Sequence, residues 1–189
     1  MNTIELTAVC QKMAHKAYFL GALPCNHLPR EIRQRPAMLV INTEPSHMAG
    51  AHWLAIYITA ESQGYFFDSY GNPPSYSEFP ETIQRFLDQH CIDVVHSTQQ
   101  VQDPSSTACG HHCVFFLFNM QKGVSYHKFL KLYGDNLPRN DEKVYDFVSR
   151  VQPSVCNEHD MSCVQSCICG CKKVTCVVFG MIIKNKTMI

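Results

Sequence analysis

Cys109 is the residue whose surroundings best suit nucleophilic chemistry. It lies in a loop rich in Ser and Thr, directly before Gly110 and a strongly apolar segment that predicts a helix. The free N–H groups and the macrodipole at the start of a helix stabilise a thiolate, which is the reactive form of cysteine. On its position alone, a buried structural cysteine is the competing interpretation, because most free cysteines pack as small apolar residues.

Catalysis by a thiol needs a base, a group that orients the base and a donor for the oxyanion. His52 lies where a loop becomes an aromatic strand, and Asp68 ends the next apolar strand. If these strands pair as a hairpin, both residues reach one end of the sheet, where the carboxylate can fix the imidazole tautomer. Gln102 lies in the loop that leads to Cys109, and its amide is a candidate oxyanion donor beside the Cys109 N–H. Separately, each has an ordinary interpretation as a surface His, a capping Asp or a turn Gln.

Two other groups of residues offer rival chemistry. His112, beside His111, follows Cys109 by three residues, so it is a rival base on the same helical face. A base on the nucleophile's own helix has little freedom to reach the thiol, so His52 is preferred. Near the C-terminus, soft ligands suggest zinc or another thiophilic metal. These cysteines are Cys163, Cys167, Cys169, Cys171 and Cys176. Their spacing does not match paired CxxC motifs, so we expect no metal site.

The elements that must position these residues follow from periodicity and turn residues. Helices are predicted over 4–16, 81–91, 113–123, 125–134 and 141–150. Strands are predicted over 37–43, 52–59 and 65–70 and at the start of 92–100. The segment 18–36 contains Gly and several Pro residues and is predicted to be a loop. A helix, a run of strands and then more helices indicate an α+β domain with a central mixed sheet of about five strands flanked by helices.

Composition and charge narrow the classes of protein. With 46% hydrophobic and 17% charged residues, the 189-residue chain has ample material for a core. We predict one domain over 1–152 and a Cys-rich tail of unknown role over 153–189. The tail carries four lysines and two acidic residues, so its net charge is +2 and that of the domain is −2. The domain therefore lacks the basic excess that non-specific nucleic-acid binding needs.

The chain shows no secretory signal pattern and no apolar run long enough to span a bilayer. Its eleven cysteines are odd in number and irregular in spacing, which is a poor disulfide framework. We therefore expect an intracellular protein with free thiols, not a secreted or membrane protein.

The residues quoted so far, taken in order, resemble the adenovirus-type cysteine proteases. The order is His-Trp, then Asp after an aromatic strand, then Gln-x6-Cys-Gly. The segments IELTAVCQKMAHKAYFLG, VINT, GAHWLAIYI, CIDVVHSTQQVQDPSSTACG and NDEKVYDFVSR also resemble that family. The resemblance covers about 4–152, does not extend to the tail, and implies a papain-like fold in the same clan as the ubiquitin-like-protein proteases.

The resemblance implies a role for each site residue. Cys109 becomes the nucleophile, His52 the base and Gln102 the oxyanion donor. Asp68 becomes the third member, where the adenoviral enzymes more often have Glu. It also implies that Trp53 borders a narrow channel for the substrate backbone, which fits cleavage next to small residues in Gly-Gly or Gly-X sequences.

Activators are a further implication of the resemblance. Cys91 lies where adenoviral proteases carry a cysteine that can form a disulfide with a viral activating peptide, although an incidental thiol at a helix end is the competing interpretation. DNA is a second activator in that family, and the negative charge of the domain gives it little electrostatic basis here.

We therefore expect a monomeric cysteine endopeptidase that needs no cofactor and acts on precursor proteins of a virus or a virus-like mobile element. If it is viral, we expect it in the nucleus or the virion. A protease for ubiquitin-like modifiers is the first alternative, since it shares the clan and its chemistry. A non-catalytic scaffold or metal-binding protein with the same fold is the second.

Overall fold

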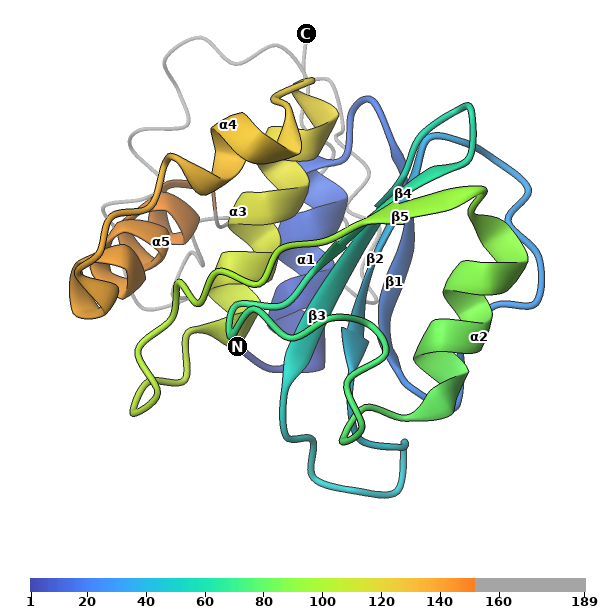
Figure 1. The fold of residues 1–189 in the computed structure, drawn as a ribbon, viewed down its shortest axis with the longest axis horizontal. Coiled ribbons are helices and arrows are strands. Elements are labelled where there is room, and N and C mark those ends of the chain that lie inside the picture. Colours follow the sequence, from blue (N-terminus) through green and yellow to red (C-terminus); the bar gives the residue numbers. More distant parts are fainter. Residues whose placement is uncertain (152–189) are drawn as a thin grey trace, which may run out of the picture. The chain divides into compact units, whose positions relative to one another are not determined.

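Five strands form one mixed sheet in the order β1-β2-β3-β4-β5 (Figure 1). They are β1 (Tyr18–Pro24), β2 (Ala37–Asn42), β3 (Trp53–Ile58), β4 (Gln63–Phe67) and β5 (Asp93–Val95). The outer pairs, β1–β2 and β4–β5, are parallel, and the inner pairs are antiparallel. The structure is a computed structural model that describes residues 1–151. The predicted tail over 153–189, with its cysteine cluster, lies outside the described residues.

Helices cover both faces of this sheet (Figure 1). One face carries α1 (Thr3–Met13), α3 (Cys109–Gln121), α4 (Tyr126–Leu130) and α5 (Leu137–Val151), and the other carries α2 (Glu81–His90). Alternate residues of β3 serve the two cores: Ala55 and Tyr57 pack with α3, whereas Leu54 and Ile56 pack with α2. Burial on both faces explains why β3 is apolar throughout, and the predicted α+β class is confirmed. Within residues 1–151, no helix has the length and apolarity to cross a membrane.

The prediction of a loop over 18–36 is wrong at its start, where β1 forms an edge strand parallel to β2. Gly21 adopts a φ of +139°, and the register shifts between Phe19 and Gly21, so the strand bulges there. Pro24 ends the strand at the sheet edge, where a residue without an N–H is tolerated. The same Gly and Pro that suggested a loop are therefore the residues of an irregular edge strand.

A tight hairpin joins β3 to β4, as predicted. The antiparallel register pairs Ala55 with Phe67 and Ile58 with Gly64, and the turn between the strands contains Ser62 at a φ of 69°. His52 precedes the first residue of β3 and Asp68 follows the last residue of β4. The hairpin thus brings these two residues to the same end of the sheet.

The predicted helix over 113–123 starts earlier in the structure, at Cys109. It lies against α1 and β3 and is buried nearly all round, as its apolar sequence indicates. Gly110 permits the close approach of α1, because a Cβ at this position would lie 3.2 Å from Met1 Cβ and 3.4 Å from a methyl group of Leu6. The nucleophile candidate is therefore the first residue of a helix held firmly in the core.

A buried polar network ties α5 to α3 and to the loop before Cys109. Asp141 Oδ1 lies 2.7 Å from His112 Nε2, and its Oδ2 accepts a hydrogen bond from Asp103 N at 3.3 Å. Tyr133 Oη lies 3.0 Å from the other ring nitrogen of His112. Asn140 Nδ2 donates to Val101 O at 3.1 Å. Both nitrogens of the fully buried His112 are occupied, so it holds the loop in place and cannot serve as the rival base.

We predict that Asp141→Ala destabilises the fold by about 3 kcal/mol, because it leaves the buried His112 ring and the Asp103 N–H without their acceptor. Chemical denaturation measures this loss. Glu142→Ala is the matched control, since it removes the neighbouring, exposed carboxylate of the same helix and should change stability by less than about 0.5 kcal/mol. Equal denaturation midpoints for the two variants would show that the network does not stabilise the loop.

Candidate active site

Cys109 and His52 form the reactive pair of the site. Cys109 is half-buried at the first position of α3, and the His52 side chain, which is 15% exposed, is hydrogen-bonded to it. The two residues come from segments more than fifty positions apart, and the packing of α3 against β3 brings them together. The sequence prediction that these residues meet agrees with the structure.

Asp68 fixes the orientation of the imidazole. Its Oδ1 lies 2.6 Å from His52 Nε2, which leaves Nδ1 of the ring for the Cys109 thiol. Asp68 is buried, and its carboxylate accepts three further hydrogen bonds, from Tyr70 N at 3.1 Å, Asn72 N at 3.1 Å and Asn72 Nδ2 at 2.8 Å. Because four polar atoms hold this carboxylate, it favours one tautomer and one ring position.

The pair favours the charged state, a thiolate beside an imidazolium. Burial lowers the pKa of His52, but hydrogen bonds to Asp68 and Cys109 and the charges of both outweigh it and raise the pKa to about 9. Burial raises the pKa of Cys109, but the hydrogen bond and charge of His52 outweigh it, with help from the backbone of Trp53 and Gly110, so the pKa is lowered. Between the lowered pKa of Cys109 and about 9, the thiolate is present and the imidazole can supply a proton.

Gln102 lies behind this pair and is only 1% exposed. Its Oε1 accepts a hydrogen bond from Ser69 Oγ at 2.6 Å, and its Nε2 donates to Tyr70 Oη at 3.2 Å and to Ser106 O at 3.0 Å. The loop backbone is also fixed, since Gln102 N donates to Ser69 O at 3.2 Å. That Gln102 helps to hold an oxyanion stays a prediction.

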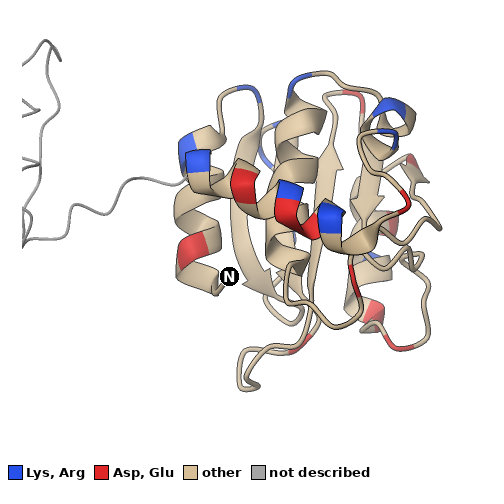
Figure 2. Ribbon diagram, turned by 90° about the vertical axis from the view of Figure 1, so that its left-hand side faces the viewer, with Lys and Arg blue, Asp and Glu red and all other residues tan. Residues whose placement is uncertain are grey.

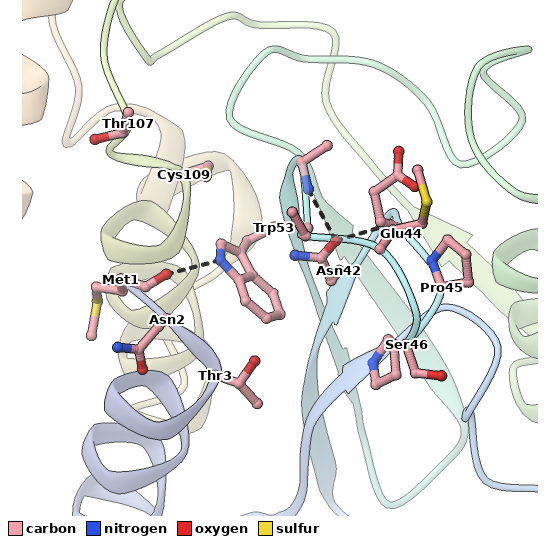
Figure 3. Close-up of a pocket in the computed structure, with 15 residues that line it drawn as sticks. Met1, Asn2, Thr3, Asn42, Glu44, Pro45, Ser46, Trp53, Thr107 and Cys109 are labelled. Atoms are coloured by element: carbon pink, nitrogen blue, oxygen red, sulfur yellow. Dashed lines mark hydrogen bonds between the residues drawn. The ribbon is translucent and has the colours of Figure 1, made fainter.

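A cavity of about 440 Å³ opens beside Cys109 (Figure 3). Trp53 lines it and is oriented by a hydrogen bond from its Nε1 to Met1 O at 3.1 Å. The loop between β2 and β3 forms the opposite wall with Glu44, and Asn42 Oδ1 shapes this loop by accepting from Glu44 N at 2.9 Å. Trp53 therefore lies where a substrate would approach Cys109, and its substrate-binding role stays a prediction.

Cys91 is separate from this site. It caps the end of α2 and packs with the core on that face of the sheet, whereas Cys109 packs with the core on the opposite face. It is half-buried against Gly64, whose Cβ, if present, would lie 2.7 Å from Cys91 Sγ. Burial raises the pKa of Cys91 to about 11. Its role as an activator site stays a prediction.

The sequence reasoning missed Ser69, Tyr70 and Asn72, which surround the predicted residues. The signal lay in the run that follows Asp68, because an Asp before Gly, Asn and Pro commonly accepts hydrogen bonds from the backbone two residues ahead. The stacking of Tyr70 on His52, with ring centroids 5.0 Å apart, depends on how this turn folds back over the hairpin. In residues 1–151 there is no cluster of three or more His, Cys, Asp or Glu residues that could hold a metal ion.

The α+β fold brings a thiol, an imidazole and a carboxylate together at the junction of sheet and helix. This is the arrangement that nucleophilic catalysis by a thiol requires. Comparison with known proteins gives the family. The sequence model of the adenovirus endoprotease family matches residues 19–130. The chain therefore belongs to the adenovirus endoprotease family.

Individual relatives are similar over different lengths. The protease of bovine adenovirus 2 is 30% identical over 122 residues, which are 60% of each chain. The protease of bovine adenovirus B serotype 3 is 28% identical over 178 residues, covering 79% of this chain and 87% of that protein. Among solved structures, the pS273R protease of ASFV has a TM-score of 0.48 and 24% identity, over 62% of this chain and 44% of that chain.

We predict that Cys109 reacts with iodoacetamide at a lower pH than an ordinary thiol does, because its pKa is lowered. Its lowered pKa preserves the thiolate as the pH falls, until the pH passes below that pKa. At about pH 7, Cys109 should be alkylated at least about 100-fold faster than Cys91, whose pKa is raised. Mass spectrometry of the labelled peptides measures both rates in one sample.

His52→Ala is the control for this pH profile. Without the imidazolium, burial is the largest remaining influence on the pKa of Cys109 and raises it, so alkylation should move to more alkaline pH. A Cys109 that reacts no faster than Cys91, or a profile that His52→Ala leaves unchanged, would contradict the ion pair.

Proposed function

We propose that the chain is a cysteine endopeptidase. The observation that carries this proposal is the arrangement of Cys109, His52 and Asp68, in which a buried carboxylate 2.6 Å from His52 Nε2 leaves the opposite ring nitrogen for a half-buried thiol of lowered pKa. A structural cysteine has no need of such partners, and the thiols of Cys10 and Cys113 in the same core have raised pKa values. The family to which the chain belongs is a family of proteases.

The proposed reaction begins with attack of the Cys109 thiolate on a peptide carbonyl carbon. The carbonyl oxygen becomes an oxyanion near the start of α3, where backbone N–H groups without helical partners can donate to it. His52 then gives its proton to the leaving amine, and an acyl-enzyme remains on Cys109. Water, deprotonated by the now neutral His52, releases the acyl group and restores the thiolate beside the imidazolium. Asp68 stabilises the imidazolium through both steps.

The proposed substrates are precursor proteins of a virus or a virus-like mobile element, cleaved next to Gly-containing sequences. Support comes from the family and from the cavity beside Trp53, which leads to the thiol. A glycine on either side of the cleaved bond would let an extended backbone pass this indole without a side-chain clash. We propose that the enzyme acts as a monomer and needs no metal.

DNA is not part of this proposal. The domain carries two more acidic than basic residues, counted over 1–152. Figure 2 shows basic and acidic residues interspersed along α5, so neither sign covers this face alone. Binding of DNA through its phosphates would need a continuous basic surface.

We predict that purified protein cleaves members of a peptide library that contain Gly-Gly or Gly-X motifs. Cys109→Ala should lower this cleavage by at least about 10³-fold, because no other group replaces the nucleophile. Cys25→Ala is the matched control, since this buried thiol lies in the other core and should leave the rate unchanged. Cleavage that survives Cys109→Ala would refute the proposal.

The modifier alternative is tested in the same experiment. Ubiquitin-like modifiers that end in Gly-Gly and carry a C-terminal electrophile are added as probes. If only the modifiers react at Cys109, the cysteine chemistry stands and the proposal of viral precursor substrates fails. If neither peptides nor modifiers react, the non-catalytic alternative is favoured.

We further propose that Cys91 forms a disulfide with an activating peptide. Its thiol lies beside Ile92, which is 84% exposed, so a peptide seated there would cover an apolar surface. Protein taken from its natural source, with free thiols blocked before lysis, should show a peptide adduct on Cys91 by non-reducing mass spectrometry. A thiol of raised pKa is a poor leaving group, so a disulfide on Cys91 should exchange slowly and survive the preparation. Recovery of Cys91 only as the blocked free thiol would therefore contradict the proposed disulfide.

A further inference from the structure

Glu44 supplies a carboxylate to the wall of the cavity beside Cys109 (Figure 3). Among the described residues that line this cavity, there is no second carboxylate and no Lys or Arg. In residues 1–151, no ion pair or hydrogen bond engages the Glu44 carboxylate, whereas those of Asp68 and Asp141 both have a histidine partner. Glu44 is half-buried, so its charge has lost part of its water without gaining a partner within the domain.

The backbone of Glu44 is held in one place. Its N–H donates to Asn42 Oδ1 at 2.9 Å, and its carbonyl oxygen accepts from Cys25 N at 3.4 Å. Asn42 is buried, and the same Oδ1 also accepts from Ala51 N at 3.3 Å, so one amide oxygen ties both ends of the loop between β2 and β3. Because these bonds leave the carboxylate itself unused, the loop presents a fixed charge to whatever enters the cavity.

Apolar side chains line the same cavity as this charge. Pro45 and Met48 belong to the loop that carries Glu44, and Trp53 begins β3. Met48 is 54% exposed, and its N–H donates to Pro45 O at 2.9 Å in a tight turn. An apolar surface next to a carboxylate suits a side chain with a long methylene stem and a cationic end, which is the form of lysine and arginine.

The reactive groups add no positive charge that would oppose such a side chain. The thiolate of Cys109 and the imidazolium of His52 balance each other, and the buried carboxylate of Asp68 leaves the site with a net negative charge. With Glu44, the charges around the cavity therefore favour a cationic side chain of a substrate and disfavour an acidic one.

We propose that Glu44 is a specificity-determining residue that binds a lysine or arginine side chain of the substrate. This inference rests on the proposed endopeptidase function and narrows its substrates to glycine-containing sequences with a basic residue close to the cleaved bond. The basic side chain would lie with its stem along Met48 and Pro45 and donate charge-assisted hydrogen bonds to the Glu44 carboxylate.

A set of peptides with one Gly-Gly motif tests this specificity. Lysine, norleucine or glutamate is placed in turn at each of the three positions before and after the glycines, and norleucine keeps the lysine stem without its charge. At one position, the parent protein should cleave the lysine peptide with a kcat/KM about 10-fold above that of the norleucine peptide, as expected for one hydrogen-bonded charge pair. The glutamate peptide should be the poorest there. Equal rates for lysine and norleucine at every position would overturn the proposal.

Substitutions at Glu44 assign the preference to its charge. Glu44→Gln keeps the shape of the side chain and the backbone contacts of the loop, so it should cleave the lysine and norleucine peptides at equal rates. Glu44→Lys should reverse the preference and favour the glutamate peptide. Each comparison is a ratio within one variant, so a loss of folded protein does not affect it. A lysine preference that Glu44→Gln leaves intact would refute the role of Glu44.

Glu61→Gln is the matched control. Glu61 is exposed in the turn between β3 and β4, at the end of the hairpin opposite to His52 and Asp68, and this variant should keep the parent preference. If the parent cleaves the peptides through Cys109 without a lysine preference, the inference about Glu44 fails and the endopeptidase proposal stands. If the parent cleaves none of them, the endopeptidase proposal fails, and the specificity assigned to Glu44 fails with it.

Discussion

The site depends on one contact, the 2.6 Å hydrogen bond between His52 and Asp68. It exists because the hairpin β3–β4 is short and in register, so that the residue before one strand and the residue after the other share an end of the sheet. A shift of one position would turn each side chain to the other face of the sheet. The two-sided burial of β3 makes such a shift costly. The register of the hairpin therefore also fixes the position of the imidazole relative to Asp68.

The second half of the site is built on a helix and not on the sheet. Cys109 begins α3, and the loop that leads to it is hydrogen-bonded to Ser69 after β4 and to Asn140 and Asp141 in α5. Each of these hydrogen bonds involves a backbone group of the loop, so together they fix the path of the loop and not merely the place of one side chain. The thiol is thus held from two sides, by packing of its helix and by anchoring of its loop.

The sequence was enough to predict the structure where the local pattern and the chemistry of the residues agreed. The aromatic strands, their short turn and the apolar helix predicted the hairpin and the junction at which His52, Asp68 and Cys109 meet. It did not suffice for β1, because an edge strand with a bulge carries the Gly and Pro residues of a loop. It also failed to predict that His112 is buried against Asp141 and that Tyr70 covers His52, because both depend on contacts between distant segments.

The thiols of residues 1–151 show that the reactivity of a cysteine depends on the groups around it. Cys113 lies one helical turn after Cys109 and shares its core, yet burial raises its pKa and its thiol donates to Trp53 O. Burial also raises the pKa of the half-buried Cys109, but the charge and hydrogen bond of His52 outweigh this effect and the pKa is lowered. Since Asp68 helps to raise the pKa of His52, the carboxylate acts on the thiol through the imidazole. A substitution at Asp68 should therefore change the pKa and the reactivity of Cys109 by changing the charge of His52.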